Sequence, residues 1–384
     1  MFTSLIKIKT LLWAALCAAH PSPNVKLNKI NMLKSFTRAF PKLNFLKSTT
    51  VRFASGLTLS LAVVSCAPTS TPTATSPSSN ASKPAETKAA APTQNIVLRI
   101  GYQKFDPLTL VKNKGKLEAR LKPLGVTEIK WTEFPSGPPQ MEALAAGSID
   151  IARTGDAPPV SAQAAGSNFV YVGTSAPKDS SSALLVKEES PIKTISDLKG
   201  KKVAFAKGSS ANYLIVRILE SEGLKWEDIT PVYLSPADAR AAFEQDNVDA
   251  WVIWDPFYAL VQSKTPVRVI RDSKGLVTNR DFYLAPKSFA DKNAKIIEAI
   301  REETEEVATW AKANPDQVAD FLSPLLKIEK PVLLTVTNRR TYGFETIPPA
   351  VVAEQQAIAD SFYKLKLIPK EIKVSEVIWQ APKN

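Results

Sequence analysis

The chain is poor in the two residue types that carry most nucleophilic and metal chemistry. Of its 384 residues, one is histidine and two are cysteine. These are His20, Cys17 and Cys66, so residues 67–384 have neither an imidazole nor a thiol. This excludes Ser-His-Asp and Cys-His nucleophiles, histidine-bound zinc or iron, and internal disulfides from that part of the chain. Phosphate-binding P-loops and Gly-x-Gly-x-x-Gly turns are missing as well. We therefore expect a binding protein that is not an enzyme and needs neither a cofactor nor a metal.

Acidic residues are missing from one region of the chain. Residues 1–65 contain nine Lys and Arg but no Asp or Glu, and they account for most of the formal net charge of +12. Beyond them, 40 of the 49 basic residues stand against all 37 acidic residues, a difference of about +3 that is ordinary for a soluble domain. The charge of the remaining chain therefore gives no reason to expect a nucleic-acid partner.

Residues 1–65 are typical of a signal region. A basic segment precedes an apolar run at 53–64, which is too short to span a bilayer but suits the core of a signal peptide. The run ends in "LAVVSC", which resembles a lipobox and predicts that Cys66 is lipidated; the alternative is a signal that is simply cleaved. Met32 precedes a complete signal of its own and is an alternative start. We expect a periplasmic protein with a lipid anchor in the membrane.

The segment that follows has no run of apolar residues with which to form a core. Residues 66–95 begin with the predicted lipidated cysteine and are otherwise rich in Pro, Ser, Thr and Ala, which predicts a disordered tether. Its ends would lie roughly 30 Å apart on average. The folded body is then expected from about residue 96 to the end of the chain.

The body alternates short apolar runs with helical patterns. Runs such as "IVLRIGY", "SIDIART", "KVAFA" and "DAWVIW" are each followed by a helical pattern, and helices dominate after residue 286. This order predicts an α/β protein of two lobes, each with a mostly parallel sheet, and a helical C-terminal part. We expect residues 96–182 and 279–384 to form the first lobe and 183–278 the second. Ligands of such folds lie beyond the carboxyl ends of strands, so the ligand-binding residues are sought at the strand-to-helix junctions.

The stretch "ARTGDAPPV" raises a question about its acidic residue. An N-cap carboxylate accepts from amides two and three residues further on, but after Asp156 these positions are Pro158 and Pro159, which have no N–H. We therefore expect the backbone of Gly155, Asp156 and Ala157 to offer amides to an anion at the helix start. The Asp156 carboxylate itself either has a structural role or faces a donor group of the ligand.

Other junctions offer hydroxyls, an amide side chain and aromatic walls. Gln103 follows the first strand, and Ser209 and Ser210 precede a helix, where one of them can cap and the other can bind. Ser235 and Asp238 fit a capping box, which needs no ligand, although this junction also faces the predicted cleft. Trp251 and Trp254 lie three apart on a strand, so one is expected in the core and Trp254 at the ligand; Tyr283 is a second aromatic candidate.

These motifs together resemble a known family. "RIGYQK", "GSIDIARTGDAPPV", "KVAFAKGSSANYL" and "DAWVIWDPF" stand in the order found in aliphatic sulfonate-binding proteins of ABC importers, within the nitrate, sulfonate, bicarbonate and taurine group of type II periplasmic binding proteins. The resemblance covers nearly all of residues 97–290. It implies two lobes that close over a small organic anion, delivery to a permease in the inner membrane, and a ligand site at Gln103, Thr154, Gly155, Asp156, Ser209, Ser210, Asp238, Ala239, Trp254 and Tyr283.

Two departures and several alternatives remain open at this point. The family more often has Gly-Ser-Asn where Ser209 and Ser210 stand here, and "KFDPLTLVKNKGKLEARL" differs from its usual small, Gly-containing stretch. We expect a monomeric receptor for an alkanesulfonate, with taurine, nitrate or bicarbonate as alternatives in the same group. A sensory module is a further alternative. Pyrimidine-precursor synthases share the fold and are enzymes. They resemble iron-dependent catalysts that contain His and Cys, which residues 67–384 lack, so this alternative is less favoured.

Overall fold

The computed structural model describes residues 95–114 and 116–382. The predicted signal region, Cys66 and the predicted tether up to residue 94 lie outside the described residues. Within the described ranges, no helix combines the length and apolarity that crossing a membrane requires.

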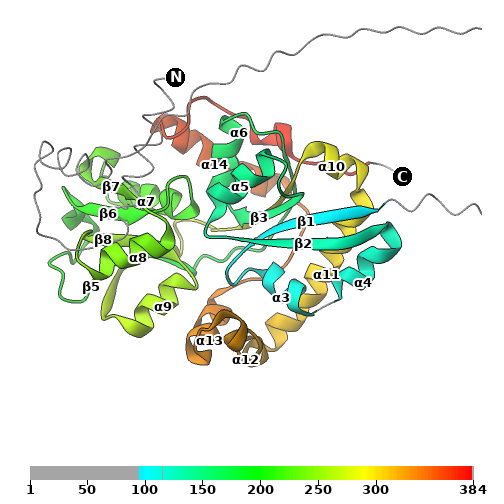
Figure 1. Ribbon diagram of the computed structural model, residues 1–384. Coiled ribbons are helices and arrows are strands. Elements are labelled where there is room, and N and C mark those ends of the chain that lie inside the picture. Colours follow the sequence, from blue (N-terminus) through cyan, green and yellow to red (C-terminus); the bar gives the residue numbers. More distant parts are fainter. Residues whose placement is uncertain (1–94, 115, 383–384) are drawn as a thin grey trace, which may run out of the picture. The chain divides into compact units, whose positions relative to one another are not determined.

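The first sheet has five strands in the order β2-β1-β3-β10-β4 (Figure 1). β1 is parallel to β2 and β3, whereas β10 is antiparallel to β3 and β4. Side chains alternate between its two faces, as the period of a strand requires: Phe282 and Leu284 pack on one face and Tyr283 and Ala285 on the other. The strands are β1 Ile96–Gln103, β2 Val126–Phe134, β3 Ile151–Gly155, β4 Val170–Thr174 and β10 Asp281–Ala285.

Helices cover both faces of this sheet. α5 (Gly137–Ala145), α6 (Ala157–Ala164) and α14 (Pro349–Lys364) pack on the face of Phe282. The other face is covered by α3 (Pro107–Lys114), α4 (Leu117–Leu121) and α11 (Ala294–Ala313), with α10 (Lys287–Lys292), α12 (Pro315–Leu326) and α13 (Lys330–Arg339) contributing beside them. The helices predicted after residue 286 include α11, on which Ile296, Ile297, Ile300 and Val307 recur at helical spacing and are all buried.

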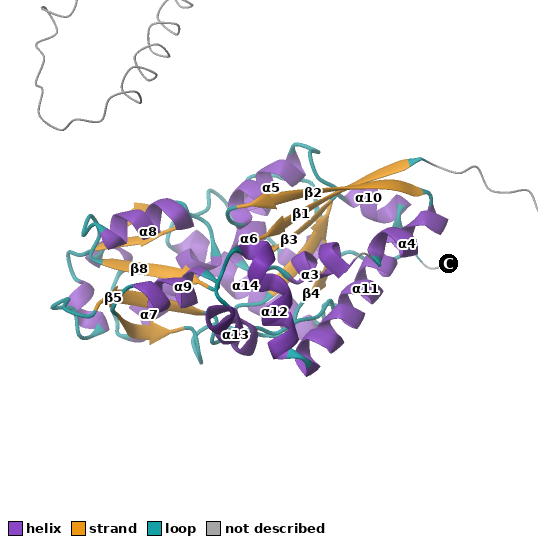
Figure 2. Cartoon of the chain, turned by 60° about the horizontal axis from the view of Figure 1, so that its bottom comes forward, coloured by secondary structure: helices purple, strands orange, loops and turns teal. Residues whose placement is uncertain are grey.

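The second sheet repeats this design in the order β7-β6-β8-β5-β9. β6 is parallel to β7 and β8, and β5 is antiparallel to β8 and β9. α7 (Ser210–Ser221) lies on one face, and α8 (Pro236–Glu244) and α9 (Phe257–Lys264) lie on the other (Figure 2). The strands are β5 Ser182–Lys187, β6 Lys202–Phe205, β7 Thr230–Tyr233, β8 Ala250–Trp254 and β9 Val267–Asp272, and short 3₁₀ helices lie at Lys122–Leu124, Ile195–Leu198, Trp226–Asp228 and Val374–Val377.

The chain crosses between the sheets twice, at residues 175–181 and 273–280. In each sheet the strand that enters after a crossing, β5 or β10, is the one that runs against the others. The predicted fold class is therefore confirmed: two α/β units with mostly parallel sheets, and helices in the C-terminal part.

Candidate functional site

A cavity of about 40 Å³ lies where residues of both sheets meet. That volume exceeds the roughly 10–15 Å³ that one water molecule requires. Its walls come from the carboxyl ends of β1, β3 and β8, the start of α7, and the two crossing segments. Six residues predicted as ligand-binding line it, namely Gln103, Thr154, Gly155, Ser209, Ser210 and Trp254.

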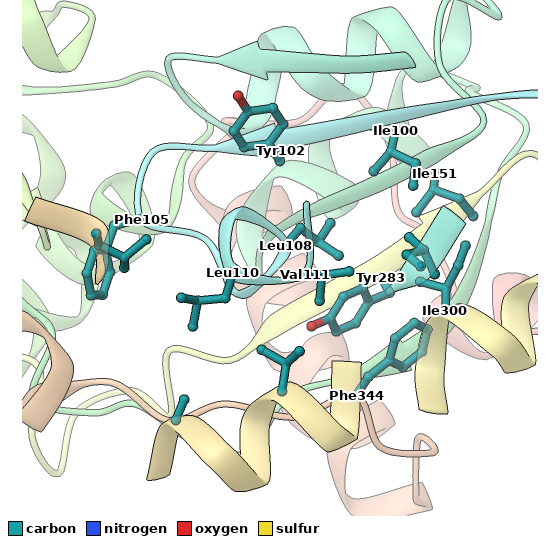
Figure 3. Packing of buried hydrophobic residues seen from close by; sticks show 14 of the residues in the cluster. Ile100, Tyr102, Phe105, Leu108, Leu110, Val111, Ile151, Tyr283, Ile300 and Phe344 are labelled. Carbon is teal, nitrogen blue, oxygen red and sulfur yellow. The ribbon is translucent and has the colours of Figure 1, made fainter. Parts of the chain in front are cut away.

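The other predicted residues do not line this cavity, and for Tyr283 the expectation of a ligand wall is wrong. Its side chain is fully buried, stacks on Phe344 with 3.8 Å between ring centroids, and donates a hydrogen bond to the Gly343 carbonyl at 3.0 Å. Figure 3 shows both rings within a hydrophobic cluster. Asp281, two residues earlier on the same face of β10, lines the cavity instead. Tyr283 and Asp281 therefore lie on the same face of β10, but it is Asp281, two residues earlier, that reaches the cavity.

Asp238 and Ala239 are also absent from the cavity wall. Asp238 is exposed, its amide donates to the Ser235 hydroxyl at 3.3 Å, and that hydroxyl donates to its carboxylate at 2.7 Å. Ala239 is buried against the second sheet. The capping interpretation of this junction accounts for both residues.

The carboxylate of Asp156 caps its own helix in an unusual way. The residues two and three positions further on are prolines without an N–H, so the Asp156 Oδ1 accepts from the Ala157 amide instead, at 2.8 Å. The expectation that the Ala157 amide is free for a ligand is therefore wrong. The Asp156 side chain is buried beneath the cavity, and burial raises the pKa of its carboxyl, while hydrogen bonds from the Ser210 hydroxyl and the charge of Lys178 oppose that rise. The carboxylate therefore has the structural role that was one expectation, and its observed partner is an amide of its own helix.

The two serines of α7 divide their tasks. Ser209 stands at the N-cap position, but its hydroxyl donates to the Ala206 carbonyl at 2.7 Å and accepts no hydrogen bond from an amide of the helix. The Ser210 hydroxyl lies against Gly155, where a Cβ would overlap it, and it lowers the pKa of the Asp156 carboxyl. Because the first amides of a helix have no carbonyl partner within it, those of Ser210 and Ala211 have no intrahelical bond, whereas the Asn212 amide donates to the Ser209 carbonyl at 2.9 Å.

The tryptophan pair follows the predicted division. Trp251 is fully buried and packs on Phe243, 5.9 Å away between ring centroids. Trp254 is half-buried, lines the cavity and meets Phe257 edge to face at 6.3 Å. An apolar wall for the organic part of a ligand therefore stands beside the polar groups.

A largely buried cluster of polar and charged side chains, which we call the charge cluster, forms much of the remaining wall and was not predicted. Asp281 is its centre: Arg153 pairs with it, Lys178 Nζ lies 3.3 Å from its Oδ1, and Arg340 Nη2 lies 3.8 Å from its Oδ2. Arg153 also approaches Asp106 at 3.3 Å. Lys178 donates to the Asn279 side chain at 3.2 Å, and Arg340 donates to the Phe105 carbonyl. The cluster comprises Asp106, Arg153, Lys178, Asn279, Asp281 and Arg340.

The electrostatics of the cluster favour an additional negative charge. Burial lowers the pKa of Lys178 well below its usual range, and the charges of Arg340 and Arg153 lower it further, against the opposite effects of Asp156 and Asp255. Burial likewise lowers the pKa of Arg153, with Asp106 opposing. An anion among these three cations would offset both the burial and their mutual repulsion.

A separate pair of charges joins the second sheet to the C-terminal helices. Asp255 follows Trp254, is buried and accepts from the Ala259 amide at 3.0 Å. Arg339 at the end of α13 places its Nη1 3.5 Å from the same Oδ1, and its guanidinium stacks over Tyr258 at 4.2 Å. Burial raises the pKa of Asp255 to about 6, with Arg339 opposing the rise.

The sequence carried only a weak signal for the charge cluster. Arg153 is a charged residue inside an otherwise buried strand, which is rare unless the charge is paired. The register pairs Arg153 with Tyr283 and Gly155 with Asp281, so Arg153 and Asp281 are diagonal neighbours across strands far apart in the chain. The described residues hold no group of three or more His, Cys, Asp or Glu side chains arranged for a metal ion.

Comparisons with known proteins agree with this fold and with the sequence resemblance. A family model described as NMT1/THI5 like matches residues 131–318. An aliphatic sulfonates-binding protein of Escherichia coli (strain K12) is 44% identical over 295 residues, which are 76% of this chain and 91% of the relative. The solved alkanesulfonate-binding protein SsuA from Xanthomonas axonopodis pv. citri, bound to MOPS, is 38% identical with a TM-score of 0.72, over 76% of this chain and all (100%) of that chain. For the periplasmic aliphatic sulphonate binding protein SsuA from Escherichia coli, the identity is 42% and the TM-score 0.69, over 77% of this chain and 94% of that one. The chain belongs to the family of aliphatic sulfonate-binding proteins.

Proposed function

We propose that this protein is the substrate-binding component of an ABC importer and captures aliphatic sulfonates in the cavity between its two sheets. The observation that carries the proposal is the charge of the cavity wall. Its lining includes the cationic side chains of Lys104, Arg153, Lys178 and Arg340, and the carboxylates of Asp255 and Asp281. An enclosed wall with more cations than anions selects a negatively charged guest.

The chemistry of a sulfonate suits the remaining groups. A sulfonate stays ionised at any biological pH and presents only acceptors, so it needs donors and no catalytic base. Ser209, Ser210 and the amides at the start of α7 can donate, and Trp254 offers an aromatic surface to the carbon chain. A small inorganic anion would leave this aromatic wall without a contact.

The division of the chain into two lobes supports a role in transport. Residues 96–182 and 279–384 form one lobe and 183–278 the other, and the lobes close over the ligand before it is delivered to the permease. The site comprises Gln103, Thr154, Gly155, Ser209, Ser210 and Trp254, together with Arg153, Lys178 and Arg340. A periplasmic location, a lipid anchor at Cys66 and a monomeric state complete the proposal and follow from the sequence pattern.

Calorimetric titration tests the ligand class. Ethanesulfonate, taurine and nitrate are titrated into the purified chain, and a sulfonate is expected to bind most tightly. Lys178→Met keeps the length of the side chain but removes a cation from the wall, so it should weaken the binding of each anion. Lys366→Met, at an exposed lysine beyond the end of α14, is the matched control. Tightest binding of nitrate would overturn the sulfonate assignment, and binding of none of the three would overturn the function.

A further inference from the structure

Among the buried oxygens of the cavity wall that have no hydrogen bond is one of Asp255. Asp255 lines the cavity and only 3% of its side chain is exposed. Its Oδ1 accepts from the Ala259 amide and faces Arg339, but its Oδ2 is buried without a hydrogen bond. A buried carboxylate oxygen without a donor is costly, and native sites usually satisfy such an atom with a ligand or a neighbouring group.

The neighbours of Asp255 do not satisfy this oxygen. Arg339 is the cation within ion-pair distance, and it is directed to Oδ1 and Tyr258. Lys178 and Arg340 act on Asp255 through their charge, but their contacts go to Asp281 and its surroundings. The Asp255 amide itself donates to the Ser181 carbonyl at 2.9 Å, which holds the residue in place.

The wall therefore has an acceptor pole, which is the Asp255 carboxylate, and a cationic pole, which consists of the cations of the charge cluster. Arg339 faces Asp255, while the next residue, Arg340, faces Asp281 within the charge cluster. Asp255 and the cationic side chains of the charge cluster line the same cavity of about 40 Å³, so one small ligand can contact both the acceptor pole and the cationic pole. Trp254, adjacent to Asp255 in the chain, supplies the apolar surface at the same wall.

We propose that Asp255 is a specificity-determining residue that receives a hydrogen-bond donor, an amine or a hydroxyl, on a short sulfonate whose anionic group binds at the cationic pole. This inference rests on the proposed function and narrows it from aliphatic sulfonates in general to those with a donor near the sulfonate group. An unsubstituted alkanesulfonate leaves the Asp255 oxygen unsatisfied and brings its apolar end to a carboxylate.

Three ligands of similar size test the inference. Taurine carries an ammonium, 2-hydroxyethanesulfonate a hydroxyl and ethanesulfonate no donor, and each is titrated calorimetrically at pH 7.5. A hydrogen bond to a charged group corresponds to about 10- to 100-fold in affinity, so both donor-bearing ligands should bind more tightly than ethanesulfonate by about that factor. In Asp255→Asn, taurine should bind more weakly, whereas ethanesulfonate should bind more tightly because a carboxylate that repels it is gone. Asp246→Asn, whose side chain is 75% exposed and outside the cavity, is the matched control.

The wild-type chain gives a second test that needs no variant. Because the pKa of Asp255 is about 6, the affinity for taurine should fall as the pH decreases below about 6, where the carboxyl becomes protonated. The affinity for ethanesulfonate should stay level or rise over the same range. Ethanesulfonate that binds as tightly as both other ligands overturns the role of Asp255 and leaves the proposed function intact. Failure of all three to bind overturns the proposed function itself.

Discussion

The contact between Gly155 and Ser210 is the place where the structure makes its sharpest prediction. Gly155 ends β3 in the first sheet, and Ser210 begins α7 in the second. A Cβ on Gly155 would overlap the Ser210 Oγ and would lie 3.4 Å from the Ser210 Cβ. The φ of Gly155 lies outside the left-handed region, so alanine is compatible with the backbone there and any cost arises from the contact.

Gly155→Ala should force the Ser210 hydroxyl away from Asp156. This hydroxyl lowers the pKa of the Asp156 carboxyl, and the interaction of a donor with a charged group corresponds to about 1.5–3 kcal/mol, or about 10- to 150-fold in affinity. Ser210→Ala removes the same hydroxyl directly and should weaken ligand binding by a similar factor. In the double variant, only the Ser210 Cβ at 3.4 Å meets the new methyl group, which is an ordinary contact. The double variant should therefore bind about as well as Ser210→Ala alone.

Calorimetry with one fixed sulfonate on all four proteins of this double-mutant cycle provides the measurement, and thermal unfolding without ligand checks that each variant is folded. The expected coupling between the two sites equals nearly the whole effect of Gly155→Ala. Additive effects, or an unchanged affinity in Gly155→Ala, would show that the two lobes do not meet at this point when the ligand is bound.

Four further substitutions separate core from cavity. Trp254→Ala should weaken sulfonate binding by about tenfold, which is about 1.4 kcal/mol, with little change in the unfolding temperature. Trp251→Ala should instead destabilise the fold by about 3–5 kcal/mol. Calorimetry and denaturant unfolding distinguish the two effects, and the reverse pattern would mean that the two rings are misassigned. Tyr283→Phe loses the bond to the Gly343 carbonyl and should lower the free energy of unfolding by about 0.5–1.5 kcal/mol without changing ligand affinity; a large loss of affinity would restore Tyr283 to the ligand wall. Arg153→Met leaves Asp106 and Asp281 without their shared cation and should cost about 3–5 kcal/mol in urea unfolding; a variant as stable as the wild type would contradict the ion-pair geometry.

The elements of the fold could be predicted because each depends on local patterns. The sequences of the buried strands are short apolar runs, and that of α11 has apolar residues at helical spacing. The start of α6 is marked by a glycine, an acidic residue and two prolines. The same local signals placed Gln103, Gly155, Ser209 and Trp254 at the ends of strands or the starts of helices, and fold geometry then brings such positions together, whereas Thr154 was expected only from the family resemblance. Local patterning was sufficient for this half of the cavity.

The charge cluster depends on pairings that no local pattern reveals. Lys178 and Asn279 lie in the two crossing segments, which have no periodicity, and Arg153 meets Asp281 only because β10 inserts beside β3. Tyr283 was expected at the ligand because it is an aromatic residue of the crossover strand and through the family resemblance. How deep a residue lies along that strand depends on its register with the neighbouring strand, which no local pattern reveals.

The position of the charge cluster also separates the rigid side of the cavity from the side that opens. The Asn279 side chain donates to the hydroxyls of Ser181 and Ser182 at 3.1 and 2.8 Å and accepts from Lys178, so it ties the two crossing segments to each other. Because both lobes are connected covalently through these segments, the distances here change least when the lobes move apart. The contact of Gly155 with Ser210 joins residues on opposite lobes without such a connection. We infer that a sulfonate is held first by the cations beside the crossing segments and is then enclosed as the start of α7 meets Gly155. The crossing segments would then recognise charge, and the start of α7 would complete closure.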